Sequence, residues 1–136
     1  MAERYVFKLC FSSEEQNSII NSTVTADKNP SYSTSPGNNT TDKVFLLSIT
    51  EINKYFSSDE ARKCAPTEYA KAQGAYTSSS YSTGGKAACC WWLRSPGGSS
   101  DRAALVLYGC SVDLGGDPVH HGDDAVRPAL WINLDS

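Results

Sequence analysis

Two apolar, aromatic-rich segments in the last third of the chain constrain its fold most strongly. Cys90–Gly97 reads Cys-Trp-Trp-Leu-Arg-Ser-Pro-Gly, and Val126–Ile132 reads Val-Arg-Pro-Ala-Leu-Trp-Ile. Each segment predicts a strand, and the first ends in a Pro-Gly turn. Between them, Val106, Val112 and Val119 recur at regular intervals and are separated by glycines, a pattern typical of short antiparallel strands joined by turns. The sequence therefore predicts a small antiparallel sheet here.

Helix-capping patterns dominate the preceding part of the chain. Ser12–Glu15 and Ser48–Glu51 are capping boxes, which predict short helices that run through Ile20 and Phe56. Two further segments also predict the start of a helix. Ser57–Glu60 repeats the capping pattern, and Thr67–Ala70 begins a short helix that Gly74 ends.

The remaining segments predict strands and loops. Alternation over Tyr5–Phe11 predicts a first strand, and the apolar run Val44–Leu47 predicts a buried one. Residues 21–42 and Thr77–Gly85 are rich in Ser, Thr, Asn or Gly and are expected to be loops. A chain of 136 residues suits one hydrophobic core, so residues 1–136 are predicted to form a single α+β domain. Its buried residues should include Trp92, Leu93, Leu130 and Trp131.

Charge and hydropathy exclude some partners. The net charge is -3 and the chain has no Lys/Arg cluster, which argues against nucleic acid as a partner. No apolar run approaches the roughly 20 residues that span a bilayer, so membrane insertion is not expected. The N-terminal residues lack the hydrophobic region of a signal peptide, and the sequence does not indicate a compartment.

The five cysteines are Cys10, Cys64, Cys89, Cys90 and Cys110. Their number is odd and no CxxC pair is present, so neither a zinc site nor a complete disulfide framework is indicated. We expect free thiols. A bridge from Cys64 to Cys89 or to Cys90 stays open as an alternative.

Residues 97–124 have an unusual composition. They contain no Lys, Glu, Gln, Met or Trp, although residues 1–96 use Lys and Glu freely. Every residue type present in this segment can be encoded by a codon that ends in a pyrimidine, and the five missing types cannot. Chance or an ordinary loop composition could also produce this bias.

A resemblance gives this bias a meaning. Four segments occur in order, and they are Thr41–Ser48, Pro66–Ala70, Trp91–Gly97 and Val126–Trp131. Together they resemble a bacterial and phage domain family with a C-type-lectin-like fold, akin to the formylglycine-generating-enzyme fold and to the variable proteins of diversity-generating retroelements. The resemblance covers roughly residues 11–134. The usual upstream segment of that family is not recognisable before Phe11.

The resemblance implies a variable protein that displays diversified residues. In such proteins an error-prone reverse transcriptase substitutes at template adenines, so the variable residues come from pyrimidine-ending codons. The positions expected to be fixed are Ala103, Ala104, Val106, Gly109, Val112, Gly115 and Val119. The positions expected to face a ligand are Leu105, Leu107, Tyr108, Ser111, Asp113, Leu114, Asp117, Pro118, His120, His121, Asp123 and Asp124.

The expected function is therefore recognition of an unknown protein or cell-surface ligand, without cofactor or catalytic residues. Tyr108, flanked by Leu105 and Leu107, could supply the aromatic and apolar anchors that dominate binding energetics. One alternative is a fixed-sequence structural or accessory domain of the same fold. A more distant one is an enzyme of the formylglycine-generating type, for which the chain shows no clear counterpart of the paired late cysteines.

Three narrower readings favour structural roles. Adjacent residues in a strand point to opposite faces, so His120 and His121 with nearby aspartates are expected to be surface residues rather than a metal site. The sequence lacks the Glu-Pro-Asn or Trp-Asn-Asp motif of calcium-dependent sugar binding, and Trp91 and Trp92 are expected in the core. Arg94 and Arg127 are expected to tie strands together through backbone carbonyls or a carboxylate.

Overall fold

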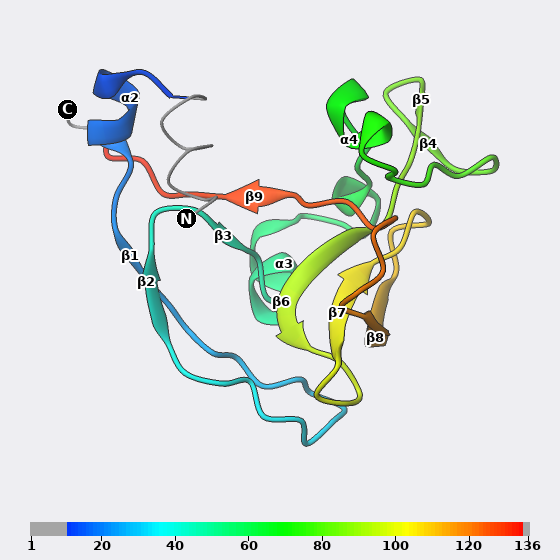
Figure 1. Ribbon diagram of the computed structural model, residues 1–136, viewed down its shortest axis with the longest axis horizontal. Coiled ribbons are helices and arrows are strands. Elements are labelled where there is room, and N and C mark those ends of the chain that lie inside the picture. Colours follow the sequence, from blue (N-terminus) through cyan, green and yellow to red (C-terminus); the bar gives the residue numbers. More distant parts are fainter. Residues whose placement is uncertain (1–10, 135–136) are drawn as a thin grey trace.

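In the computed structural model, which describes residues 11–134, one three-stranded antiparallel sheet and three two-stranded sheets combine with short helices (Figure 1). The helices are α2 (Ser13–Ser18), α3 (Ile49–Tyr55), the 3-10 turn η1 (Glu60–Arg62) and α4 (Glu68–Ala72). The strands are β1 (Ser22–Val24), β2 (Thr40–Asp42), β3 (Phe45–Leu46), β4 (Ser82–Thr83), β5 (Lys86–Ala87), β6 (Trp91–Pro96), β7 (Arg102–Val106), β8 (Val112–Pro118) and β9 (Pro128–Ala129). The predicted α+β class is confirmed.

The three-stranded sheet has the order β6-β7-β8 and forms the centre of the domain. Trp91 pairs with Val106, and Val106 with Val112, so these three residues share one face of the sheet. Trp91 and Val106 are fully buried, and Val112 packs against the core from its border. Leu93, two residues after Trp91, extends the same apolar face, which explains why this strand is so rich in large side chains.

Helix α3 covers the apolar face of the sheet with Ile49 and Ile52. Its capping box is confirmed, because the Ser48 side chain accepts from the Glu51 backbone and the Glu51 side chain accepts from the Ser48 backbone. The Ser95 hydroxyl of β6 accepts a hydrogen bond from the Ile49 backbone N–H at 2.9 Å, inside the core. This bond anchors the first turn of α3 on the sheet.

The other predicted helix starts were correct to different degrees. Ser12 forms the second capping box at α2, and Thr67 caps α4, which is followed by Gly74 in a left-handed conformation (φ +104°). Ser57–Glu60 leads only into the single 3-10 turn η1, and Asp59 makes no side-chain cap there. The predicted strand Tyr5–Phe11 lies almost entirely outside the described residues.

Three predictions about strands and loops were wrong. Residues 21–42 contain β1 and β2, which pair through Thr23 and Thr41, and the loop around Thr77–Gly85 leads into the β4–β5 hairpin. Apart from Val24 and Ala87, both pairs consist of Ser, Thr and other polar residues, so hydrophobic alternation could not reveal them. The Val126–Ile132 segment keeps only β9, which pairs with β3.

Burial of the two aromatic segments also differs from expectation. Leu93 is buried, Trp92 and Leu130 are half-buried, and Trp131 is 45% exposed. Beyond β9 the chain leaves the core and pairs with the segment after α2, where the Ile20 N–H donates to the Trp131 carbonyl at 2.9 Å. The Trp131 ring packs only edge-on against Tyr55, with ring centroids 5.7 Å apart, so the prediction that it is a core residue was wrong.

Val119 likewise is not a core residue, because its side chain is 63% exposed. The interval from Val112 to Val119 crosses an irregularity in β8, where the register against β7 shifts between Ala103 and Leu105. Val112 and Val119 are also seven positions apart, so the alternation of a strand by itself points them to opposite faces, and Val119 lies beyond the end of β8 at Pro118. Within residues 11–134, no helix is long and apolar enough to cross a membrane.

Candidate ligand-binding surface

The turn between β7 and β8 presents the first group of predicted contact residues. Leu107 and Ser111 close the turn, with the Leu107 N–H donating to the Ser111 carbonyl at 2.8 Å. Cys110 has a positive φ of 73°, which lets the chain reverse within so few residues. Tyr108 and Ser111 are exposed and Leu107 is half-buried, so this turn displays side chains as predicted.

Tyr108 does not stand alone, because the ring of Tyr81 packs beside it with centroids 5.5 Å apart. Tyr81 comes from the loop before β4, and both rings keep an exposed edge. Gly109 makes this approach possible, since a Cβ at that position would lie 3.3 Å from the Tyr81 ring. Lys63 Nζ lies 5.6 Å from the centroid of the same ring. Tyr81 was not among the predicted contact residues, because its only signal was an aromatic residue in a polar loop.

The second group lies at the other end of β8. Asp117, His121 and Asp124 offer one ligand atom each, and these atoms lie within 4.8 Å of one another. His120 and His121 occupy the turn after β8 rather than a strand, and their ring centroids are 5.1 Å apart. The argument that strand alternation separates the two histidines was therefore wrong. Carboxylate and imidazole groups at this spacing can bind a metal ion or a cationic group of a ligand.

Asp124 is the most perturbed carboxyl group of this cluster. Burial, together with the neighbouring Asp117 and Asp123 carboxylates, raises the pKa of Asp124 to about 6, and His121 opposes the shift. Its Oδ2 atom is buried and accepts no hydrogen bond from any described residue. A hydrogen-bond donor or a positive charge on a ligand would therefore stabilise the ionised Asp124 carboxylate.

The Cys90 thiol is influenced by both groups, through a hydrogen bond with the Tyr108 backbone and through the charges of the Asp117, Asp123 and Asp124 carboxylates. Burial is the main cause that raises the pKa of Cys90, and the three carboxylates add to it.

Two of the predicted contact residues are not displayed. Leu105 is 0% exposed, because it lies in the central strand β7 opposite Trp92 and is covered on that face of the sheet. Leu114 is half-buried and packs against the core cluster from β8. The prediction that both side chains face a ligand was wrong, and both belong to the scaffold.

Two further predicted positions have structural duties. Asp113 Oδ1 accepts a hydrogen bond from the Gly116 N–H at 3.0 Å, which holds the irregular part of β8. Pro118 is half-buried and pairs with Arg102 at the end of the sheet. His120 and Asp123 are exposed and carry no such duty among the contacts of the described chain.

The sequence matches the family described as a domain of unknown function (DUF6273) over residues 4–134, which is nearly the whole chain. The chain belongs to this family. No curated protein and no solved structure matches it.

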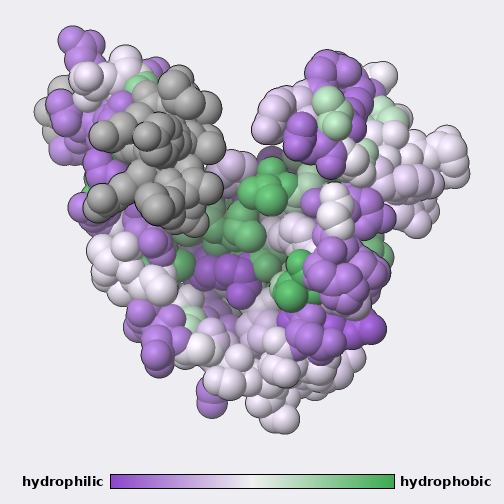
Figure 2. All heavy atoms as spheres, viewed as in Figure 1, coloured by the Kyte–Doolittle hydropathy of each residue, from purple (hydrophilic) through white to green (hydrophobic). Residues whose placement is uncertain are grey.

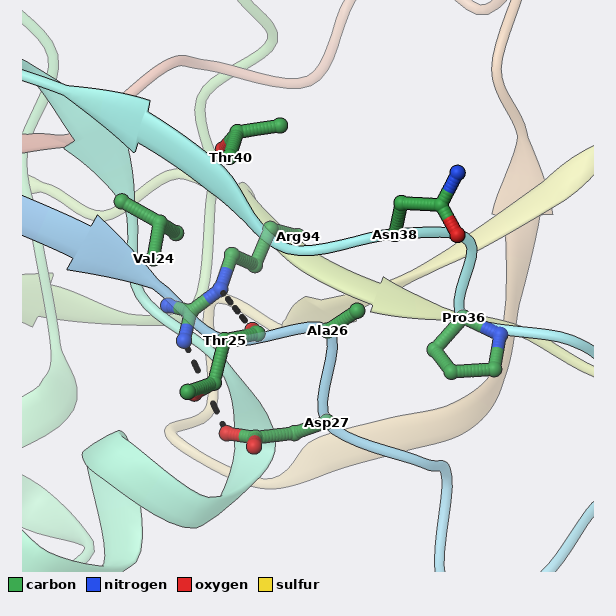
Figure 3. Close-up of a pocket in the computed structure, with 8 residues that line it drawn as sticks. All are labelled: Val24, Thr25, Ala26, Asp27, Pro36, Asn38, Thr40 and Arg94. Atoms are coloured by element: carbon green, nitrogen blue, oxygen red, sulfur yellow. Dashed lines mark hydrogen bonds and ion pairs between the residues drawn. The ribbon is translucent and has the colours of Figure 1, made fainter.

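Arg94 of this DUF6273 domain lines a cavity of about 210 Å³ beside β1 and β2 (Figure 3). Its guanidinium donates to the carbonyls of Thr25 at 3.1 Å and Leu46 at 2.8 Å, and it pairs with the carboxylates of Glu51 and Asp27. Two carboxylates compensate its charge, so the cavity offers an anion little attraction. The prediction that Arg94 ties strands together is confirmed.

Arg127 has a similar role on the opposite edge of the core. Its Nη1 donates to the Arg62 carbonyl at 3.2 Å, and its guanidinium carbon lies 5.0 Å from the ring centroids of both Phe56 and Trp91. The Trp91 indole N–H donates to the same carbonyl at 3.0 Å. The two aromatic-rich segments thus meet where Arg127 packs on Trp91 and both side chains bind the Arg62 carbonyl.

Proposed function

We propose that this DUF6273 domain is a ligand-binding module with a C-type-lectin-like scaffold, and that its displayed residues are diversified as in the variable proteins of diversity-generating retroelements. One observation carries the proposal. Within residues 97–124, some residues support the fold and others are displayed to solvent. Ala104, Leu105 and Val106 are buried in β7, whereas Tyr108 and His121 in the following turns are exposed. The supporting backbone can therefore stay constant while the exposed side chains change.

The contact set is accordingly smaller than the sequence alone indicated. It comprises Leu107, Tyr108, Ser111, Asp113, Asp117, Pro118, His120, His121, Asp123 and Asp124. Tyr81 joins this set as a constant aromatic neighbour of Tyr108. Half of the set is exposed, and substitutions of exposed residues usually change stability by no more than about 0.5 kcal/mol; the exposed members are Tyr108, Ser111, His120, His121 and Asp123.

The chemistry of this surface favours one class of partner. An aromatic pair supplies the rigid anchor that commonly dominates a protein interface, and such an anchor contributes at least about 2 kcal/mol when truncation is measured. Three aspartates close to the histidine pair make the adjoining area acidic. The partner is proposed to be a protein surface that presents Lys or Arg beside an apolar pocket.

Sequencing of the gene and its surroundings tests the diversification directly. A reverse transcriptase gene nearby, and a template repeat with adenines at the codons of the contact set, are expected. Deep sequencing of the gene from one cell population should show amino-acid changes at those codons, with Leu105, Leu114 and Tyr81 constant. An invariant segment without a template repeat would contradict the proposal and favour a structural or accessory domain of fixed sequence.

A further inference from the structure

Cys64 and Cys89 face each other in the structure although 25 positions separate them. They form an antiparallel bridge in which the Cys89 N–H donates to the Cys64 carbonyl at 2.8 Å. Hydrogen-bonded pairs in antiparallel chains have Cα atoms about 5.5 Å apart. Disulfides span Cα separations of about 4.4–6.8 Å, so the backbone already has the spacing that a bridge requires. The Cys89 thiol also donates to the Cys64 carbonyl at 3.4 Å, which places it on the Cys64 side of the chain.

The adjacent Cys90 points to the other side of the chain. Its thiol lies beside the Tyr108 backbone and the acidic cluster, whereas the Cys89 thiol also contacts the Cys64 carbonyl at 3.4 Å. Successive side chains of an extended segment alternate between faces, which explains the separation. Of the two pairings that the sequence left open, the geometry selects Cys64 with Cys89.

The two thiols line a cavity of about 210 Å³ between α4 and β9. Its wall includes Pro66, Thr67 and Val126 together with Arg127. Figure 2 shows that this side of the molecule is hollowed beside the lobe that carries α4, with hydrophobic residues on the floor. Cys89 is buried and Cys64 is half-buried, so Cys64 is the thiol that an incoming molecule meets first.

The surroundings of Cys64 favour its thiolate. The hydrogen bond with Cys89 is the main cause that lowers the pKa of Cys64 to about 6, and the Arg127 guanidinium adds to the effect against the burial of the thiol. The same hydrogen bond and burial raise the pKa of Cys89. A half-buried thiolate next to a protonated partner thiol is the arrangement in which one cysteine attacks and the other resolves.

We propose that Cys64 and Cys89 form a thiol–disulfide exchange site that reacts with small-molecule disulfides entering this cavity. The Cys64 thiolate attacks one sulfur of the small disulfide, forms a mixed disulfide and releases the first small thiolate. The Cys89 thiol gives its proton to that thiolate and attacks Cys64 Sγ, which forms the Cys64–Cys89 bond and releases the second small thiolate. In the net reaction the Cys64 thiolate and the Cys89 thiol are oxidised to one disulfide, and the small disulfide is reduced to one thiol and one thiolate.

This site goes beyond the proposed recognition function and does not depend on it. Oxidation would join the segment before α4 covalently to the segment before β6. The cavity lies between these elements and β9, so the bond would also fix one of its walls.

The experiment uses the full chain equilibrated with glutathione and glutathione disulfide at several ratios, quenched with acid, alkylated, and digested with trypsin for mass spectrometry. The tryptic peptide that starts at Cys64 should become cross-linked to the peptide that carries Cys89 and Cys90, in proportion to the disulfide present. Cys89→Ser should abolish the cross-link and accumulate glutathione on Cys64. Cys90→Ser, the matched control one residue away, should leave the cross-link unchanged.

A second measurement covers the case in which Cys89→Ser does not fold. The rate of alkylation of Cys64 by iodoacetamide in the unmodified protein should rise with pH around a midpoint near 6. The proposal is overturned if no cross-link forms at the most oxidising ratio, or if the link needs Cys90. A midpoint at the ordinary thiol value of about 8.5 would also overturn the assignment of Cys64 as the attacking group.

Discussion

Gly116→Ala is expected to be strongly destabilising, and Gly84→Ala provides a matched control. Both glycines have a positive φ, 71° at Gly116 and 56° at Gly84. An alanine in either place incurs the same left-handed backbone cost of about 1–2 kcal/mol, partly offset by a less flexible unfolded chain. The two positions differ in what surrounds them.

A Cβ at Gly116 would lie 2.1 Å from the Ala103 carbonyl oxygen and 2.5 Å from its carbon, whereas a Cβ at Gly84 meets nothing within 4 Å. Ala103 belongs to β7, the central strand of the sheet, which pairs on both sides and cannot withdraw. Overpacking of this kind costs typically about 1–3 kcal/mol. We expect the free energy of unfolding to fall by about 2–3 kcal/mol more in Gly116→Ala than in Gly84→Ala.

Urea unfolding followed by tryptophan fluorescence measures this difference, because the buried Trp91 reports on the core next to β7. The dependence of the unfolding free energy on urea should be the same in both variants. Equal losses of stability would refute the reasoning. They would mean that the irregular part of β8 can move away from β7, and that it does not hold the display segment in place.

Three further outcomes are expected. Leu105→Ala should lower the free energy of unfolding in urea by about 2–5 kcal/mol, because the Leu105 side chain is fully buried. A loss below about 1 kcal/mol would show that Leu105 is displayed to a ligand after all. His121→Ala should change the free energy of unfolding, measured in urea, by no more than about 0.5 kcal/mol, and a larger loss would show that His121 supports the scaffold. Because the pKa of Asp124 is raised to about 6, its contribution to stability is full below its unfolded pKa of about 4 and is lost as the pH rises through 6. Asp124→Asn should therefore stabilise the domain at pH 7.5 relative to the parent but not at pH 3.5, and equal urea midpoints of the two proteins at both values would contradict this.

Local signals in the sequence predicted local structure well. The capping boxes at Ser12 and Ser48 and the cap at Thr67 each depend on residues three positions apart, so the sequence contains everything that forms them. The strand at Trp91–Pro96 was equally visible, because a short run of large apolar residues ends there in a Pro-Gly turn. The polar pairs β1–β2 and β4–β5 carried no such period and were missed.

Tertiary structure decided how the candidate sites are assembled. Tyr81 reaches Tyr108, Cys64 faces Cys89 rather than Cys90, and Asp124 joins Asp117 and His121 only because separate segments fold together. The division between scaffold and display had the same origin. Leu105 is buried because β7 becomes the central strand between β6 and β8, and this strand order is set by long-range pairing, which the spacing along one segment does not contain.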